Sequence, residues 1–282
     1  MNTASGVYSS IDLGVVSTLT YYLQQNRTNE FMQFLIILSD EHYKKGVFIK
    51  SYYERIKEQE FPGELTILNK KDLAKDEYKG LYIMEGNVMI KKLYIKLPKE
   101  NLYVDAGTYE EKLLDSITNE FLRILATLNA HHVKLKIYNE NDNNFKFNLN
   151  TSVIVKGFKV GAGGNHEQSS SNATKYDWEL TFSNSTDSID INIFVNPVHF
   201  YYLPKHTEWS DVIRNRLELG QDNATHIYEH TDSNDIRMDF ISKLHMLNIE
   251  CNYQKHKYEK LRFEYSIKYH PISKNNNSCS IQ

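Results

Sequence analysis

The strongest constraint on the fold is a strict alternation of apolar and polar residues in one segment. In Leu261–Tyr269 every odd-numbered residue is apolar or aromatic, and every even-numbered residue is polar or charged. Because the side chains of a strand point alternately to its two faces, this pattern predicts a strand with one buried face and one wet face. Tyr176–Phe182 and Ile189–Val195 alternate in the same way. Strands of this kind are typical of antiparallel sheets, and we expect the second half of the chain to form one.

One helix is predicted with a defined start and a continuous apolar stripe. Thr108 and Glu111 have the spacing of a capping box, in which each side chain bonds the backbone N–H of the other residue. The short strand Leu102–Val104 precedes this helix, and a strand with apolar residues at period two follows it. The apolar residues of the helix and of the second strand are Leu113, Ile117, Phe121, Ile124, Leu125, Leu128, Val133, Leu135 and Ile137. This passage predicts a strand–helix–strand unit.

Turn signals and helical spacing place several further elements. Glu85-Gly86-Asn87 separates Leu81–Met84 from Val88–Leu97, which predicts a hairpin. A helix is expected over Glu208–Leu219, capped by Thr207 and ended by Gly220. The remaining predicted elements are strands at Phe145–Leu149 and Val153–Val160 and a helix at Asp235–Leu247.

The first sixty residues have helical spacing. We expect one helix from Ser9 or Ser10 to Leu23, a second from Thr28 to Gly46 and a third over Phe48–Glu60. The run Phe34–Leu38 is also compatible with a buried strand, because a short apolar run does not fix the period. The predicted fold class is therefore α+β. A helical region spans residues 1–64, a mainly antiparallel sheet with a few packed helices spans residues 65–272, and a flexible tail spans residues 273–282.

Charge and cysteine content bound the possible partners and the compartment. The formal net charge is −3 without a long block of lysine or arginine, so nucleic-acid binding is not expected. Two cysteines cannot make a disulfide framework, and the first residues lack the pattern of a secretory signal. The longest apolar run, Phe34–Leu38, is far shorter than a membrane span. These features predict a cytoplasmic protein.

A pair of histidines gives the most enzyme-like motif. His226-Ile227-Tyr228-Glu229-His230 has the H-x-x-E-H spacing of one class of zinc peptidase, which on a helix places both imidazoles on one face. Gly220 ends the preceding helix, and the neighbouring Asn and Thr residues favour a turn or strand. We therefore treat His226 and His230 as weak candidates for metal ligands and expect no cofactor.

A glycine cluster follows the predicted strand that ends at Val160. Gly161-Ala162-Gly163-Gly164 is not followed by a helix, which a phosphate-binding loop requires, so we expect a mobile hairpin loop. The flanking segments, residues 151–160 and 174–186, are amphipathic. An amphipathic hairpin is compatible with insertion into a membrane as part of a pore.

One further group of residues is a candidate for binding, and one pair of histidines is explained by its position. Trp209, Arg214 and Arg216 lie close together in sequence and are weak candidates for an anionic or aromatic recognition site, against the alternative of a core tryptophan with solvated arginines. His131-His132 falls at a helix-to-strand junction, where polar residues are expected.

The last four residues carry the most specific motif. Cys279-Ser280-Ile281-Gln282 matches the C-a-a-X pattern of prenylation, on a polar arm that begins at Ser273. The first aliphatic position is a serine and the upstream segment has few basic residues. A single lipid in this setting anchors a protein weakly and reversibly.

From these features we expect a non-enzymatic binding or adaptor protein at the cytosolic face of a membrane, tethered through Cys279, with a protein or the membrane surface as its partner. One alternative is a soluble hydrolase that uses His226, Glu229 or His230. A second alternative is a membrane-inserting protein that uses the hairpin around the glycine cluster.

Overall fold

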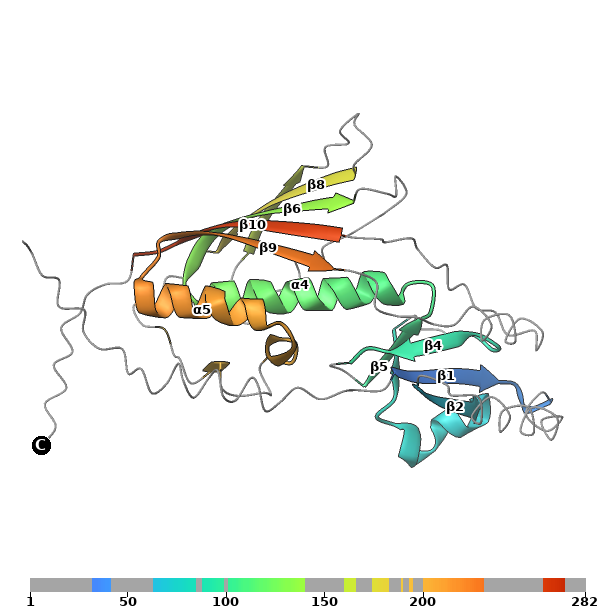
Figure 1. The fold of residues 1–282 in the computed structure, drawn as a ribbon. Helices are drawn as coiled ribbons and strands as arrows, with labels where there is room; N and C mark the ends of the chain where they lie inside the picture. The colour runs from blue at the N-terminus through green and yellow to red at the C-terminus, as the bar shows by residue number, and fades with distance from the viewer. Residues whose placement is uncertain are drawn as a thin grey trace, which may run out of the picture. The chain divides into compact units, whose positions relative to one another are not determined.

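The computed structural model describes residues 32–41, 63–84, 88–98, 101–139, 160–165, 174–182, 200–230 and 261–271, together with residues 189, 193 and 194. Strands predominate over helices, and the fold is α+β (Figure 1). The described residues divide into two compact units. The first runs from β1 into the start of helix α4, and the second contains the rest of α4 and the elements that follow it. The first unit runs across residue 64, where the sequence predicted a boundary.

The first unit is built on a five-stranded mixed sheet in the order β2-β1-β4-β5-β3. β1 pairs in parallel with β2 and antiparallel with β4, while β5 is antiparallel to β4 and parallel to β3. Two short 3-10 helices, η1 and η2, follow β2. The bounds of the strands and helices are β1 Met32–Leu38, β2 Gly63–Asn69, η1 Lys70–Ala74, η2 Asp76–Tyr78, β3 Tyr82–Ile83, β4 Leu93–Lys96 and β5 Leu102–Asp105.

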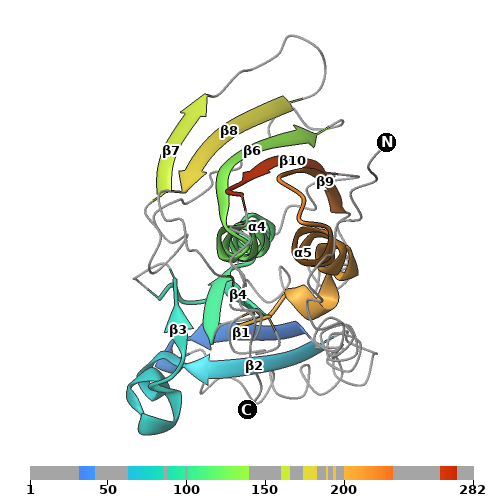
Figure 2. The same cartoon turned by 90° about the vertical axis from the view of Figure 1, so that its left-hand side faces the viewer.

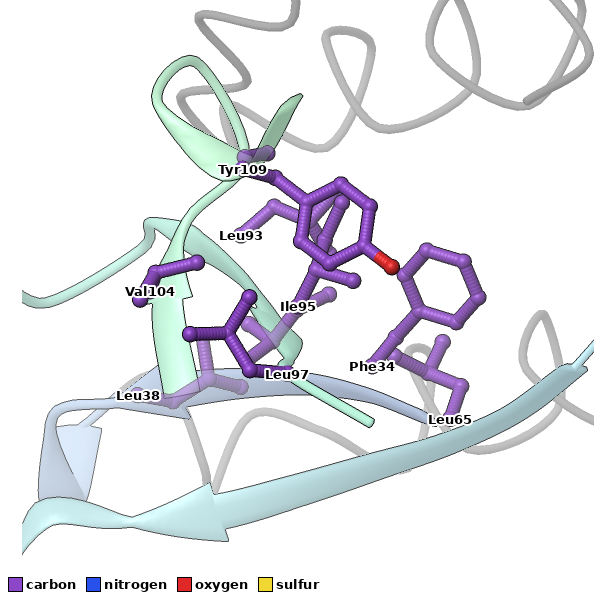
Figure 3. Packing of buried hydrophobic residues seen from close by; sticks show 10 residues of the cluster. Phe34, Leu38, Leu65, Leu93, Ile95, Leu97, Val104 and Tyr109 are labelled. Carbon is purple, nitrogen blue, oxygen red and sulfur yellow. The ribbon is translucent and has the colours of Figure 1, made fainter. Parts of the chain in front are cut away.

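β1 is an interior strand of this sheet, between β2 and β4, and residues 34–38 are buried on both faces. On one face Phe34, Ile36 and Leu38 pack with residues of β2, β4 and β5 and with Tyr109 (Figure 3). On the other face Leu35 and Ile37 pack against a second apolar cluster. The predicted helix from Thr28 to Gly46 is therefore wrong at β1, and the alternative of a buried strand is confirmed. A strand covered on both faces has no polar alternation, which is why the period was ambiguous.

The predicted hairpin around residues 85–87 is not formed. β3 and β4 are not neighbours, because β5 lies between them and pairs with both. The Tyr82 backbone N–H donates to the Asn101 carbonyl, and the Met84 N–H donates to the Tyr103 carbonyl. The backbone hydrogen bonds of β3 are thus made to β5 and not to β4.

Polar residues gather where the parallel strands of this unit end. The Lys92 ammonium and the Asp105 carboxylate form a buried ion pair with an N–O distance of 2.6 Å. After β1, the Asp40 carboxylate accepts from the Asn69 amide at 2.9 Å and from the Lys71 ammonium at 2.6 Å. These bonds tie the chain after β1 to the end of β2.

Helix α4, Tyr109–Thr127, begins three residues after β5 ends. Its predicted apolar stripe is buried from Ile117 onward, and Leu113 is partly buried. The predicted capping box is not formed: the Thr108 hydroxyl donates to the Asp105 carbonyl at 3.2 Å. The Asp105 carboxylate instead accepts from the Gly107 N–H at 2.6 Å. The strands before and after α4 belong to different sheets, so the strand–helix–strand passage joins the two units.

The second unit contains a five-stranded antiparallel sheet in the order β7-β8-β6-β10-β9. Figure 2 shows these strands arching over α4 and α5. The predicted alternation of β10 is confirmed, since its odd-numbered residues are buried and its even-numbered residues are partly or fully exposed. The bounds are β6 Ala130–Asn139, β7 Val160–Asn165, β8 Thr174–Phe182, β9 Asn223–His230 and β10 Leu261–Tyr269.

Helix α5, Thr207–Leu219, confirms the prediction for that segment and ends at Gly220, whose φ of 62° is left-handed. The residue before the helix is His206, which holds the cap position predicted for Thr207. The short helix η5, Leu203–Lys205, precedes it. The buried Glu120 carboxylate of α4 accepts from the backbone N–H groups of residues 201, 202 and 203, which fixes the start of η5 on α4.

Two loop and strand predictions are wrong. The glycine cluster does not form a hairpin loop: residues 161–164 lie within β7, which pairs with β8. Ile193 and Phe194 form a 3-10 turn where a strand was predicted. The helices predicted at residues 9–23, 48–60 and 235–247, and the strands predicted at 145–149 and 153–159, lie outside the described residues.

Candidate functional site

On the outer face of the second unit's sheet, polar residues lie side by side on β9, β10 and β6. Residues that pair across these neighbouring strands form rows. In the first row Asn223 pairs with Lys268, which pairs with His132. In the second row Thr225 pairs with Ser266, which pairs with Lys134. Paired residues on neighbouring strands have Cβ atoms about 4.5–5.5 Å apart, and diagonal neighbours about 7–8 Å. Lys268 and Lys134 are diagonal neighbours, so their ammonium groups can reach a common ligand.

These six residues, together with Ala224 and Ile267, line a pocket with a volume of about 420 Å³. Among the described residues that line it, the charged or ionisable ones are basic: His132, Lys134 and Lys268. Thr225 and Ser266 add hydroxyl groups, and Asn223 adds an amide. The volume falls within the range of pockets that hold small molecules, roughly 300–1,000 Å³.

The two lysines of the pocket have no partner among the described residues. Within the described part of the chain, neither the Lys134 nor the Lys268 ammonium forms an ion pair or hydrogen bond. The His132 Nε2 atom lies 3.2 Å from the Glu179 carboxylate, whose side chain is 64% exposed. Because Glu179 also pairs in register with Lys134, its carboxylate is the nearest acidic competitor for an anion bound here.

Outside the pocket the charges of this face alternate in sign. In the next row Glu264 pairs with Lys136, which pairs with Asp177, and in the following row Arg262 pairs with Glu229. Opposite charges on neighbouring strands offset one another there. In the second row Glu179 offsets Lys134 in the same way, whereas neither residue opposite Lys268, His132 or Asn223, is acidic.

Arg216 holds the end of the sheet at which the pocket lies. This buried side chain of α5 donates to the backbone carbonyls of Leu128, Gln221 and His270 and to the Asp222 carboxylate. Its guanidinium lies 4.6 Å from the centre of the Tyr269 ring. Burial lowers the pKa of Arg216, and the hydrogen bond that the guanidinium donates to the Asp222 carboxylate opposes that shift. The guanidinium thus fixes the end of α4, the start of β9 and the end of β10 together.

A bulge in β6 also shapes this end. Lys268 pairs with His132 and Tyr269 pairs with Ala130, so His131 is the extra residue. The rings of His131 and His270 lie 4.7 Å apart. Burial lowers the pKa of His131, and the proximity of His270 lowers it further. Since bulges increase the local twist of a strand, His131 helps to set the direction of the adjacent His132.

His226 and His230 lie on a strand, β9, as the sequence context favoured over a helix. Both face the helices, separated by Tyr228, whose hydroxyl lies 3.1 Å from His230 Nδ1. Four residues of a strand span about 13 Å, so the two imidazoles do not converge on one ion as they do on a helix. Glu229 is exposed on the opposite face. Among the described residues, no group of three His, Cys, Asp or Glu side chains is arranged to hold a metal ion.

His226 instead belongs to an aromatic cluster between β9 and the helices. Its ring lies 5.0 Å from that of Phe121, and the Trp209 ring lies 4.9 Å from Phe121 on α4. Burial lowers the pKa of His226, against a smaller raising effect of Glu208. The partly buried imidazole packs here against the Phe121 ring.

The predicted recognition group on α5 is not brought together. Trp209 is buried, as the alternative held. Arg216 is buried as well, so its predicted exposure is wrong, whereas Arg214 is exposed and pairs with Asp211 at 2.7 Å. Cys279 and the C-a-a-X residues lie outside the described residues.

Of the six polar residues of the pocket, His132 was noted in the sequence as a junction residue, and the other five were not singled out. Their signal is the set of even-numbered polar residues of β10 and β6 and the odd-numbered residues of β9. These lie on one face only because β10 is inserted between β6 and β9, which come earlier in the chain.

Within the described part of the chain, no helix is both long and apolar enough to cross a membrane. Comparisons of the chain with protein-family models, curated proteins and solved structures found no match. The site therefore has to be interpreted from its own chemistry.

Proposed function

We propose that the protein is a non-enzymatic binding protein that holds an anionic group in the pocket of the second unit. The observation that carries this proposal is the position of Lys134 and Lys268, two lysines on neighbouring strands that line one pocket without an ion-pair partner among the described residues. Hydrogen bonds from ammonium groups to phosphate or carboxylate oxygens are stronger than those between neutral groups. A bound anion would also relieve the repulsion between the two lysines.

The proposal is tested by isothermal titration calorimetry of the full chain with pyrophosphate at low ionic strength. We expect the double variant Lys134→Ala/Lys268→Ala to bind at least roughly tenfold more weakly than the wild type, because two charge-assisted contacts are lost. Lys136→Ala is the matched control: it removes a lysine from the same strand and face, outside the pocket, and should change the affinity by less than about twofold. Equal losses in the double variant and the control would refute the pocket as the site.

A second part of the proposal concerns a membrane tether. If residues 279–282 end the mature chain, prenylation of Cys279 would supply one lipid, which by itself anchors a protein only reversibly. A cationic pocket that binds anionic headgroups would supply the second membrane contact that stable anchoring requires.

The tether is tested on protein made in a eukaryotic cell by its intact mass, with and without a farnesyltransferase inhibitor. We expect a mass increment of one farnesyl group that the inhibitor removes and that Cys279→Ser abolishes. An unmodified mass would refute the tether and leave the anion-binding proposal untouched.

A further inference from the structure

The pocket has more room and more polar groups than a single phosphate needs. With a volume of about 420 Å³ it can hold a phosphate together with an organic moiety. We propose that its ligand is a phosphorylated polyol, such as an inositol phosphate or a sugar phosphate. This inference rests on the proposed function and specifies its ligand.

The phosphate end of the pocket is formed by Lys134 and Lys268, with His132 beside them. Lysine is a compact point charge on a flexible stem, so the two ammonium groups can follow phosphate oxygens without a fixed geometry. His132 contacts the exposed Glu179 carboxylate, which can turn into solvent when a ligand anion takes its place. Three donors thus converge from two neighbouring strands.

The polyol end is formed by Thr225 and Ser266, which face each other on β9 and β10, with Asn223 one row away. Hydroxyl and amide groups both donate and accept hydrogen bonds, as do the hydroxyl groups of a polyol. None of these three side chains forms a hydrogen bond within the described part of the chain. Their bonding capacity is therefore available to a ligand.

The lining argues against a nucleotide. Proteins commonly recognise bases by stacking them on aromatic side chains. Among the described residues that line the pocket there is no Phe, Tyr or Trp, and its one aromatic ring, that of His132, lies at the phosphate end beside the lysines. The rows of hydroxyl and amide groups fit a saturated, hydroxylated ring instead.

The test compares two anions of similar charge in titration calorimetry: inositol 1,4,5-trisphosphate and tripolyphosphate, which has no ring hydroxyl groups. We expect the inositol phosphate to bind at least fivefold more tightly to the wild type. The variant Thr225→Val/Ser266→Ala should lose this preference and keep its affinity for tripolyphosphate. Thr181→Val, on the same face of β8 and outside the pocket, is the control and should keep the preference.

The outcomes separate the two proposals. Equal affinities for both anions in the wild type would refute the polyol ligand while anion binding stands. Absence of binding to either anion would refute both. A preference that survives in Thr225→Val/Ser266→Ala would refute the assignment of these hydroxyl groups.

Flotation with phosphatidylcholine vesicles, with and without phosphatidylinositol 4,5-bisphosphate, distinguishes the source of the ligand. Binding to the soluble inositol phosphate with recruitment to the phosphoinositide vesicles assigns the ligand to a lipid headgroup. Binding to the soluble compound without recruitment assigns it to a free metabolite. Recruitment that persists in Lys134→Ala/Lys268→Ala would contradict a role of the pocket at the vesicle surface.

Discussion

Replacement of Arg216 by Met should destabilise the second unit strongly. The change removes the donors to three backbone carbonyls and one carboxylate while it keeps an apolar side chain of similar length. A buried acceptor left without its donor costs about 1–3 kcal/mol. Asp222 is 57% exposed and regains water, so its loss counts for little. We therefore expect a loss of about 3–5 kcal/mol in the free energy of unfolding.

Tryptophan fluorescence during urea unfolding measures this loss in the second unit, because both tryptophans of the chain, Trp178 and Trp209, belong to that unit. With a urea dependence of about 2 kcal/mol per molar, the midpoint should fall by about 2 M. Arg214→Met is the matched control. Its ion pair with Asp211 is exposed, so the free energy should change by less than about 1 kcal/mol. A midpoint for Arg216→Met within error of that of Arg214→Met would contradict this structural role of Arg216.

Three further results are expected. Lys92→Met leaves a buried carboxylate without its cation, so the free energy of unfolding of the first unit, followed by far-ultraviolet circular dichroism, should fall by about 3–5 kcal/mol. The double variant Lys92→Met/Asp105→Asn should recover part of this loss, and no recovery would contradict the prediction. Glu179→Gln should tighten pyrophosphate binding about two- to fivefold by removing the nearest competing carboxylate; weaker binding would contradict that assignment. Because burial lowers the pKa of His226, the imidazole of the unfolded chain is protonated at a higher pH than that of the folded chain. The free energy of unfolding should therefore fall as the pH drops below about 6.5, and it should fall less steeply in His226→Gln. Identical slopes in the two proteins would contradict the assignment.

Local patterns in the sequence predicted the elements whose two faces differ. β10 and β8 were found because one face is buried and the other is wet, and α5 was found because its apolar spacing ends at a glycine. β1 has no such contrast, since both of its faces are buried, and its run of apolar residues fits a helix equally well. β7 was missed because its glycines are poor strand formers, and pairing with β8 overrides that local preference.

The site depended on information that no single segment carries. The polar residues of β10 could be assigned to a wet face from the sequence. Only the order of the strands in the sheet places Lys268 beside His132 and Ser266 beside Lys134. The same dependence explains the error at β3, whose partner is β5 and not the nearer β4. Strand order is set by long-range packing, which period and turn signals do not report.

The most direct test of anion binding at this pocket is a map of backbone amide shifts in the nitrogen-15-labelled full chain during titration with pyrophosphate. We expect the largest saturable shifts on residues 132–134, 223–225 and 266–268, and we expect them to disappear in Lys134→Ala/Lys268→Ala. Shifts centred instead on the exposed lysines of η1, or the same map in the double variant, would contradict it.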